Sequence, residues 1–221
     1  MSNLEHEQTI LVSMVTLMEK GSWQVLLLGG ASGTGKSTAA QAIGRHVGGS
    51  WLQVDDLRLV LQYGELLTPR DFPDLFYFLQ LADVRAVSPE TLRDQLIAIA
   101  RLMTPAIRSV VGHHTMTQKR IILEGDGIAP AAAAEQQSET VRAVFLVVTD
   151  EATLQHNMMA RGRGVIAHSP ETEAQGRAWV QLAWHYNQWL EQEARKYGLP
   201  MLSPQPYETL VMRILDAADR D

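Results

Sequence analysis

The chain has 221 residues, of which 46% are apolar and 20% are charged, and its formal net charge at pH 7 is -6. These proportions are typical of a globular protein and exclude a disordered or fibrous one, and the length suits one domain with or without an insertion. The chain contains no cysteine, which excludes a disulfide scaffold, a thiolate nucleophile and a cysteine zinc site.

Hydropathy, cysteine content and net charge also limit where the protein is expected to be located and what it is expected to bind. No apolar run approaches the roughly 18 residues that a membrane span needs, and residues 10–18 follow two glutamates instead of a basic region. We therefore expect neither a membrane anchor nor a signal peptide, and the absence of cysteine favours the cytoplasm. The negative net charge argues against broad nucleic-acid binding, which usually requires a basic surface.

Along the chain, short apolar runs typical of buried strands alternate with helical patterns. A helix is predicted from Leu4 to Lys20, with Gly21 at its end. Strands are predicted at Val25–Leu28, Trp51–Val54, Ile121–Leu123, Ala143–Val148 and Met201–Leu202. The alternation indicates an α/β protein of three layers, in which a parallel sheet lies between helices and ligands bind at the carboxyl ends of the strands.

The stretch between the second and third strands is too long for a single helix. Residues Leu92 to Val110 carry apolar side chains at helical spacing, which predicts a long helix bent near Pro105. We therefore predict a helical insertion at 63–119 within a domain that spans 22–221. The helix at 1–21 would pack on that domain, and 161–170 would form a lid over the site.

A glycine-rich loop directly after the first strand gives the strongest functional signal. It matches the pattern Gly-x4-Gly-Lys-Ser/Thr without a break. Glycines let successive backbone amides turn toward a phosphate group, and the following helix adds its positive dipole end. Lys36 would reach the terminal phosphates and Ser37 would coordinate Mg²⁺. The residues predicted to bind ATP or GTP are Gly30, Ala31, Ser32, Gly33, Thr34, Gly35, Lys36, Ser37 and Thr38.

Charged residues at the end of the second strand suggest what accepts the phosphate. A carboxylate at Asp55 can take the proton of an acceptor hydroxyl, and Arg58, one helical turn later, can hold a negative group of the acceptor. Asp56 is a second candidate for the base. Alternatively, Asp55 or Asp56 caps the next helix and Arg58 is solvated.

Polar residues also follow the third and fourth strands. Glu124 is a candidate magnesium ligand, acting through water, and Asp126 could contact the substrate. Arg161 and Arg163 lie among glycines after a helix that begins at Asp150, where they could close over a nucleotide. Both groups are also compatible with an ordinary strand exit and an ordinary helix end.

Together these motifs resemble the P-loop small-molecule kinases, most closely the 2-phosphoglycerate kinase-like group, and more loosely chloramphenicol phosphotransferase and polynucleotide kinase. The resemblance rests on the loop Gly30 to Ser37, the Asp-x-x-Arg pattern of Asp55 and Arg58, the segment 121–125 with Pro130, and Arg161. It implies a five-stranded parallel sheet in the order 2-3-1-4-5. It also implies that Asp55 is the base, Arg58 an acceptor ligand and Arg161 a lid residue.

The leading hypothesis is an ATP- and Mg²⁺-dependent kinase for a hydroxyl group of a small molecule, with Lys36, Asp55 and Arg161 as its catalytic residues. Two alternatives are a nucleotide-binding regulatory or docking module and a kinase for nucleic-acid ends. A small-molecule kinase requires a second, polar cavity that faces Lys36 and is lined by Asp55, Arg58 and part of the insertion. By analogy, the purine would rest near the loop from Ser203 to Tyr207.

Overall fold

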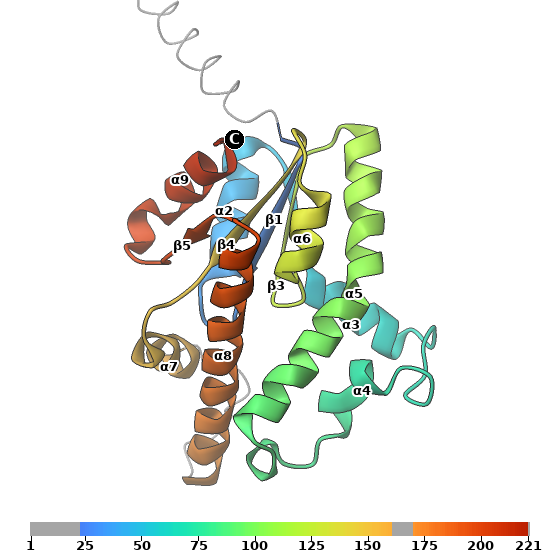
Figure 1. Cartoon of the computed structure of the whole chain (residues 1–221), viewed down its shortest axis with the longest axis vertical. Helices are drawn as coiled ribbons and strands as arrows, with labels where there is room; N and C mark the ends of the chain where they lie inside the picture. Colours follow the sequence, from blue (N-terminus) through green and yellow to red (C-terminus); the bar gives the residue numbers. More distant parts are fainter. Residues whose placement is uncertain (1–22, 161–169, 221) are drawn as a thin grey trace, which may run out of the picture.

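The computed structural model describes residues 23–160 and 170–220. The predicted helix at 4–20, Arg161, Arg163 and residues 161–169 of the predicted lid lie outside these ranges. Within them, no helix is both long and apolar enough to cross a membrane. Figure 1 shows a central sheet with helices on both of its faces.

The sheet has five strands in the order β2-β3-β1-β4-β5, and all of its pairings are parallel. This confirms the α/β class and the strand order that the family resemblance implied. The strands are β1 Val25–Gly30, β2 Ser50–Gln53, β3 Ile121–Gly125, β4 Val141–Leu146 and β5 Met201–Leu202.

Four of the five strands differ from the predictions at one or both ends, and β1 and β3 each run two residues further, to Gly30 and Gly125. β4 begins at Val141 because Val141 pairs with Val25 of β1, so the strand starts and ends two residues earlier than expected. β2 ends at Gln53, and Val54 already belongs to the next helix. Val147 and Val148 continue the apolar run beyond the end of β4, and Val54 is an apolar residue just beyond the end of β2, so hydropathy alone does not locate these two ends.

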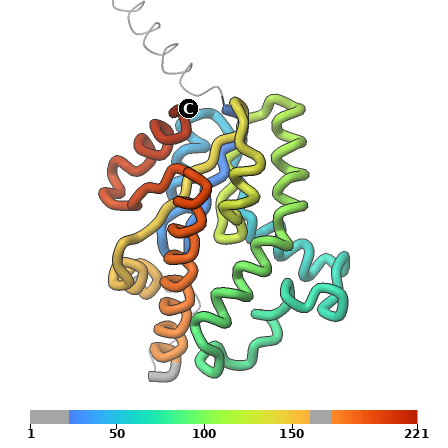
Figure 2. Tube along the Cα trace, viewed as in Figure 1, coloured from blue at the N-terminus to red at the C-terminus, as the bar shows by residue number. Residues whose placement is uncertain are grey.

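Helices follow the strands and cover the two faces of the sheet. They are α2 Lys36–Val47, α3 Val54–Tyr63, α4 Pro73–Gln80, α5 Pro89–Thr117, α6 Pro130–Gln136, α7 Glu151–Ala160, α8 Pro170–Lys196 and α9 Tyr207–Ala218, with a 3₁₀ helix at Val84–Ala86. Helices α3, α4 and α5 lie between β2 and β3, which confirms that this stretch contains several helices. Figure 2 follows the chain through them, with α5 and α8 running along the sheet.

Alternate residues of the strands contribute to two separate cores. In β1, Val25 and Leu27 join a cluster with α5, α6 and α8, whereas Leu26 and Leu28 join another with α2 and α9. All six residues of β1 are buried because both faces of the central strand are covered. Helices therefore pack on both faces of the sheet, and the loops at its carboxyl edge extend from well-packed strands.

The long helix α5 contains Pro105 in its interior, as predicted. Proline has no backbone N–H, so the bond to the carbonyl one turn earlier is missing there. Figure 1 shows that α5 changes direction along its length. The bend lets one part of α5 pack on the sheet while the other part reaches α4, against which it also packs.

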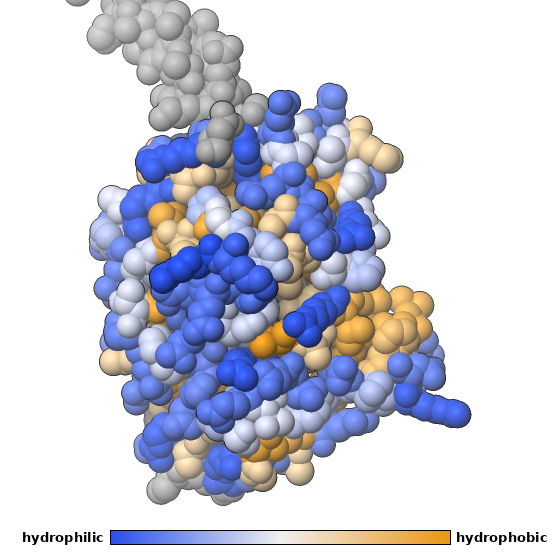
Figure 3. Space-filling view, viewed as in Figure 1, coloured by the Kyte–Doolittle hydropathy of each residue, from blue (hydrophilic) through white to orange (hydrophobic). Residues whose placement is uncertain are grey.

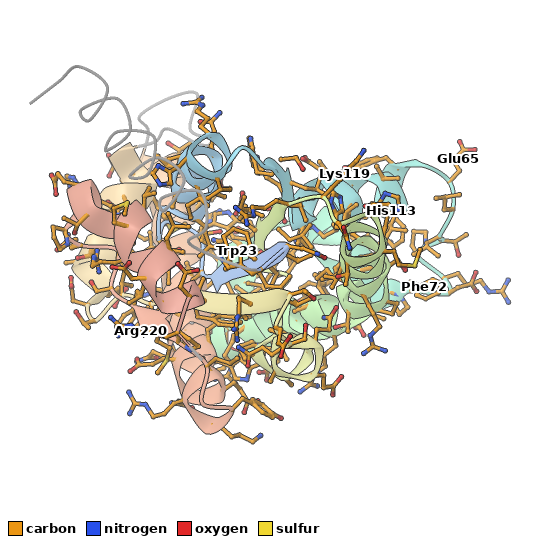
Figure 4. The ribbon with its side chains drawn as sticks, turned by 90° about the horizontal axis from the view of Figure 1, so that it is seen from above. Trp23, Glu65, Phe72, His113, Lys119 and Arg220 are labelled. Carbon is orange, nitrogen blue, oxygen red and sulfur yellow. The ribbon has the colours of Figure 1, made fainter. Side chains whose placement is uncertain are left out.

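Figure 4 shows the molecule from above, with Trp23 near its centre and Glu65 at the outer edge beside the α3–α4 connection. The guanidinium of Arg120 lies 4.9 Å from the ring centroid of Trp23, and its Nε donates to the Trp23 carbonyl. These contacts fasten the amino-terminal end of β1 to the residue that precedes β3. The glycine-rich loop follows the opposite, carboxyl end of β1.

Candidate active site

The glycine-rich loop connects β1 to α2 and occupies the carboxyl edge of the sheet. Gly35 is the N-cap of α2 with a φ of 88°, a left-handed conformation that favours glycine. The buried Lys36 begins the helix, and its Nζ donates to the Ala31 carbonyl oxygen at 2.8 Å. The hydroxyl of Thr34 donates to the same oxygen at 2.9 Å. The loop is thus folded back on itself, with the ammonium group inside its curve.

Helix α7, which follows β4, supports the loop. The Nδ2 of Asn157, on α7, donates to the Gly33 carbonyl at 2.9 Å and to the Tyr207 hydroxyl at 2.7 Å. Gly33 has a φ of 85°, and a Cβ added to it would lie 2.9 Å from Met158 Cγ, so glycine is required here on two grounds. Asn157 therefore ties together the glycine-rich loop, α7 and the start of α9.

Asp55 and Arg58 form an ion pair on α3, with 2.9 Å between the arginine Nη2 and the carboxylate Oδ1. The N-cap of α3 is Gln53, so neither Asp55 nor Asp56 caps the helix, and that alternative is wrong. Both aspartates instead lie in the first turn of α3. Asp56 is exposed, whereas Asp55 and Arg58 line a cavity.

The surroundings of Asp55 raise its pKa from 3.8 to about 6. The largest cause is its partial removal from water, since 43% of the side chain remains exposed, followed by the carboxylate of Asp126. The charges of Arg58 and Lys36 lower the pKa, and Glu124 raises it. These charges therefore act on a common point at the carboxyl edge of the sheet. A carboxylate with this pKa is mostly ionised at pH 7 and accepts a proton more readily than an ordinary aspartate.

Glu124 and Asp126 reach the site from β3. Glu124 is 2% exposed and lies in register between Leu28 of β1 and Gln53 of β2, so its carboxylate is at the base of the site. The backbone carbonyl of Asp126 accepts a 2.6 Å hydrogen bond from the buried Tyr186 hydroxyl of α8. Burial, followed by the charge of Asp126, raises the pKa of Tyr186 well above its usual range, so the phenol stays a donor.

The oxygen donors at this edge suit Mg²⁺. Ser37 offers a hydroxyl in the first turn of α2, and Glu124 offers a carboxylate; both are hard ligands of the type that Mg²⁺ takes. In residues 23–160 and 170–220, no group of three or more His, Cys, Asp and Glu side chains could hold a metal ion. An Mg²⁺ ion would therefore share its coordination with phosphate oxygens and water, as is usual for this ion.

A cavity of about 280 Å³ opens beside Asp55, between the glycine-rich loop and the helices of the predicted insertion. Its polar residues are Ser32, Asp55, Arg58, Gln62 and Asp126. The other residues that line it are Leu59, Leu75, Phe78, Leu79, Leu96, Ile99, Met158, Trp179, Leu182, Ala183 and Tyr186. A second cavity lined by Asp55, Arg58 and part of the predicted insertion is thus present, but it is mainly apolar and Lys36 does not line it, so it meets only part of the requirement. Its apolar walls come from α3, α4, α5, α7 and α8.

The structure brings together most of the residues that the sequence singled out. Lys36, Asp55, Arg58 and Asp126 meet at one edge of the sheet, together with Glu124, although Lys36 does not line the cavity. Arg161 and Arg163 are outside the described residues. The sequence did not single out Asn157 or Tyr186, whose hydrogen bonds join residues 124 and 60 positions apart.

Comparison with known proteins gives distant structural similarities. No family model matches the sequence, and no curated protein matches it either. A gluconokinase from Sinorhizobium meliloti aligns over 90% of this chain and 91% of its own, with 17% identity and a TM-score of 0.47. A shikimate kinase from Acinetobacter baumannii in complex with shikimate aligns over 88% and 92%, with 15% identity and a TM-score of 0.47. A shikimate kinase from Aquifex aeolicus aligns over 87% and 95%, with 17% identity and a TM-score of 0.44. Similarities at this level do not assign a substrate to this chain.

Proposed function

We propose that this protein is an ATP-dependent phosphotransferase that moves the γ-phosphate of ATP to a hydroxyl group of a small molecule. The observation that carries the proposal is the arrangement at the carboxyl edge of the sheet. There a glycine-rich loop with an enclosed lysine lies next to a carboxylate of raised pKa, and that carboxylate lines a separate cavity. The loop would bind the donor and the cavity would bind the acceptor.

Each residue has a definite task in the transfer. The loop amides and Lys36 would bind the phosphates, and Mg²⁺ held by Ser37 and Glu124 would neutralise part of their charge. The acceptor oxygen would form a bond to the γ-phosphorus while the bond from that phosphorus to the bridging oxygen of ADP breaks. Asp55 would orient the hydroxyl and receive its proton. Arg58, paired with Asp55, would hold the carboxylate in place.

The cavity supports a small acceptor over the two alternatives. A nucleotide sensor needs the loop but no second cavity beside a carboxylate. A nucleic-acid end would need a basic groove leading to Asp55, and Arg58 is the one cation among the described residues that line the cavity. We therefore propose a metabolite-sized acceptor.

A direct test combines nucleotide binding with a transfer assay. Purified protein is titrated with MgATP in a calorimeter and then incubated with γ-labelled ATP and pooled hydroxyl compounds. Replacing Lys36 with methionine should weaken MgATP binding by roughly tenfold to a hundredfold, because a charged contact to phosphate is lost. Lys119→Met is the matched control, since Lys119 is exposed at the end of α5, away from the loop.

The role of Asp55 is tested with a neighbouring control. Asp55→Asn should keep MgATP affinity and reduce transfer by roughly a hundredfold or more, the scale of a lost general base. Asp56→Asn should retain transfer, because Asp56 is exposed and does not line the cavity. Full activity in Asp55→Asn, or loss in Asp56→Asn alone, would show that Asp55 is not the base. Failure to bind MgATP would refute the proposed function.

A further inference from the structure

The walls of the cavity beside Asp55 carry information about the acceptor. Two of its aromatic residues, Phe78 of α4 and Trp179 of α8, lie with their ring centroids 5.8 Å apart. Leucines from α3, α4, α5 and α8 and Met158 of α7 complete the surface, so apolar side chains from five helices face the space. A ligand that fills this cavity would exchange water for apolar contact over most of its surface.

The polar groups of the cavity are largely engaged already. Arg58 is paired with Asp55, and Gln62 donates its amide Nε2 to the Leu75 carbonyl at 2.6 Å. The phenol of Tyr186 is committed to the Asp126 carbonyl. A polyol would therefore lose hydrogen bonds to water without finding enough partners in return, which is costly in an apolar site.

The charges of the cavity also oppose an anionic acceptor. Arg58 is balanced by Asp55, and Asp126 adds a second carboxylate at the same place. Among the described residues that line the cavity, the formal charge is therefore negative. A carboxylate or phosphate on the acceptor would meet this charge in surroundings that screen it weakly.

The apolar character continues onto the outer surface. Leu59 and Leu79 line the cavity and are also 46% and 47% exposed, and Val60 and Leu66 nearby are exposed as well. Figure 3 shows apolar atoms gathered on the side of the molecule where Figure 1 draws α3 and α4. The entrance to the cavity is thus apolar on the side of these two helices.

From these observations we infer that the acceptor is a neutral alcohol with an apolar body about the size of a substituted aromatic ring. The inference rests on the proposed phosphotransfer and specifies its acceptor class. The hydroxyl would lie at Asp55, where its oxygen bonds to the γ-phosphorus, its proton passes to the carboxylate and ADP leaves. The apolar body would lie between α4, α5 and α8, against Phe78 and Trp179.

A series of acceptors with a common three-carbon chain tests the inference. The probes are 3-phenylpropan-1-ol, propane-1,3-diol and 4-hydroxybutanoate, which share three methylene groups and differ only in the group opposite the hydroxyl. Their binding is measured by calorimetry with the non-hydrolysable analogue Mg-AMPPNP present, and their kcat/KM is measured with MgATP. We expect the phenyl compound to bind at least roughly tenfold more tightly and to have a kcat/KM roughly a hundredfold higher, because apolar sites discriminate on this scale.

Two matched pairs of variants locate the effect in the cavity. Trp179→Gln is compared with Tyr197→Gln, because both aromatic residues are about equally exposed, at 40% and 41%, and only Trp179 lines the cavity. Leu79→Gln is compared with Leu102→Gln on the same principle. The cavity variants should raise KM for the phenyl compound roughly tenfold with little change in kcat, and the controls should leave both unchanged. All four positions are at least 37% exposed, so folding should be preserved.

The outcomes separate this inference from the proposed function. Preferential binding or transfer with the diol or the hydroxy acid would overturn the acceptor class and leave phosphotransfer standing. Absence of binding by 3-phenylpropan-1-ol, or binding that Trp179→Gln and Tyr197→Gln reduce equally, would also overturn it. The pooled transfer screen and the Asp55→Asn variant decide the phosphotransfer itself, independently of these results.

Discussion

The pKa of Asp55 lies at about 6, whereas its ordinary value is 3.8. Only the ionised carboxylate can receive the acceptor proton, so transfer should increase with pH as Asp55 loses its own proton near pH 6. We expect kcat/KM for the acceptor, measured between about pH 4.5 and pH 8, to rise through this value and then level off. In Asp55→Asn the residual rate should lack this rise. A rise that persists unchanged in the variant would assign the titration to another group.

The same shift affects stability with a definite sign. The folded protein favours the neutral form of Asp55, since its folded pKa is above the unfolded value. This contribution is fully present below pH 3.8 and is lost as pH rises through about 6. Asp55→Asn should therefore raise the Tm of the nucleotide-free protein at about pH 8 and have little effect near pH 4. An equal Tm difference at both pH values would contradict this, with Asp56→Asn as the control.

Asn157 joins three parts of the chain through one amide group. Replacing it with alanine removes the hydrogen bonds to the Gly33 carbonyl and the Tyr207 hydroxyl. The loop should then be less well ordered for phosphate, and MgATP affinity should fall by roughly tenfold, as for the loss of one or two hydrogen bonds. Gln155→Ala, exposed on the same helix, should have no effect in the same calorimetric titration. Equal losses in the two variants would point to a general effect on α7.

At the scale of single residues, the sequence predicted local relations well and distant ones poorly. Asp55 and Arg58 are three positions apart on a helix, so their closeness follows from helical geometry, although the sequence assigned Arg58 to the acceptor and did not predict its ion pair with Asp55. The hydrogen bond from Asn157 to Gly33 depends on how α7 packs beside the loop, and no local sequence pattern predicts that packing. The sequence therefore singled out the charged groups of the candidate site and missed Asn157, which holds the loop.

At the scale of elements, α8 is attached to the sheet by two neighbouring side chains. Tyr186 donates to the Asp126 carbonyl after β3, and the fully buried Asn187 bonds to both the N–H and the carbonyl of Val148 after β4. These contacts fix one helix to the ends of two strands that flank β1. The cavity wall formed by Trp179 and Leu182 belongs to the same helix, so its position depends on them.

We expect Asn187→Leu to be strongly destabilising. The change leaves the N–H and the carbonyl of Val148 buried without partners, and each such group costs about 1–3 kcal/mol, so the free energy of unfolding should fall by roughly 2–5 kcal/mol. Urea unfolding measures this directly, with Gln188→Leu as the exposed neighbouring control. Tyr186→Phe should cost less, about 1 kcal/mol, because it removes one hydrogen bond. A loss below that of the control would show that Val148 finds other partners.

The element boundaries show where hydropathy stops being informative. Gly35 ends the loop and Lys36 begins α2 as expected, because the required left-handed backbone favours glycine. α7 begins at Glu151, one residue after the predicted start at Asp150, and the Oδ1 of Asp150 accepts the Thr153 N–H at 2.8 Å. In contrast, the start of β4 is set by its pairing with β1, which the sequence around Val141 does not reveal.

For the whole molecule, the alternation of strands and helices was enough to predict the three layers, because both faces of a parallel sheet must be covered. The strand order came from a family resemblance, since alternation alone allows several orders. The cavity could be expected beside Asp55, but its apolar walls could not. They come from five helices, and the apolar face of each helix, taken separately, cannot be distinguished from a face that packs in the core.

Because the glycine-rich loop is built on the central strand, ligand binding should stabilise the entire fold. A nucleotide present at about 100 times its Kd should add about 2.7 kcal/mol to the free energy of unfolding, which scanning calorimetry would detect as a higher Tm. Adding 3-phenylpropan-1-ol to the Mg-AMPPNP complex should raise the Tm further, since a second site fills. Lys36→Met should lose most of the nucleotide increment, whereas Trp179→Gln should lose only the alcohol increment. If both variants lost both increments, the loop and the cavity would not be the separate sites that the structure indicates.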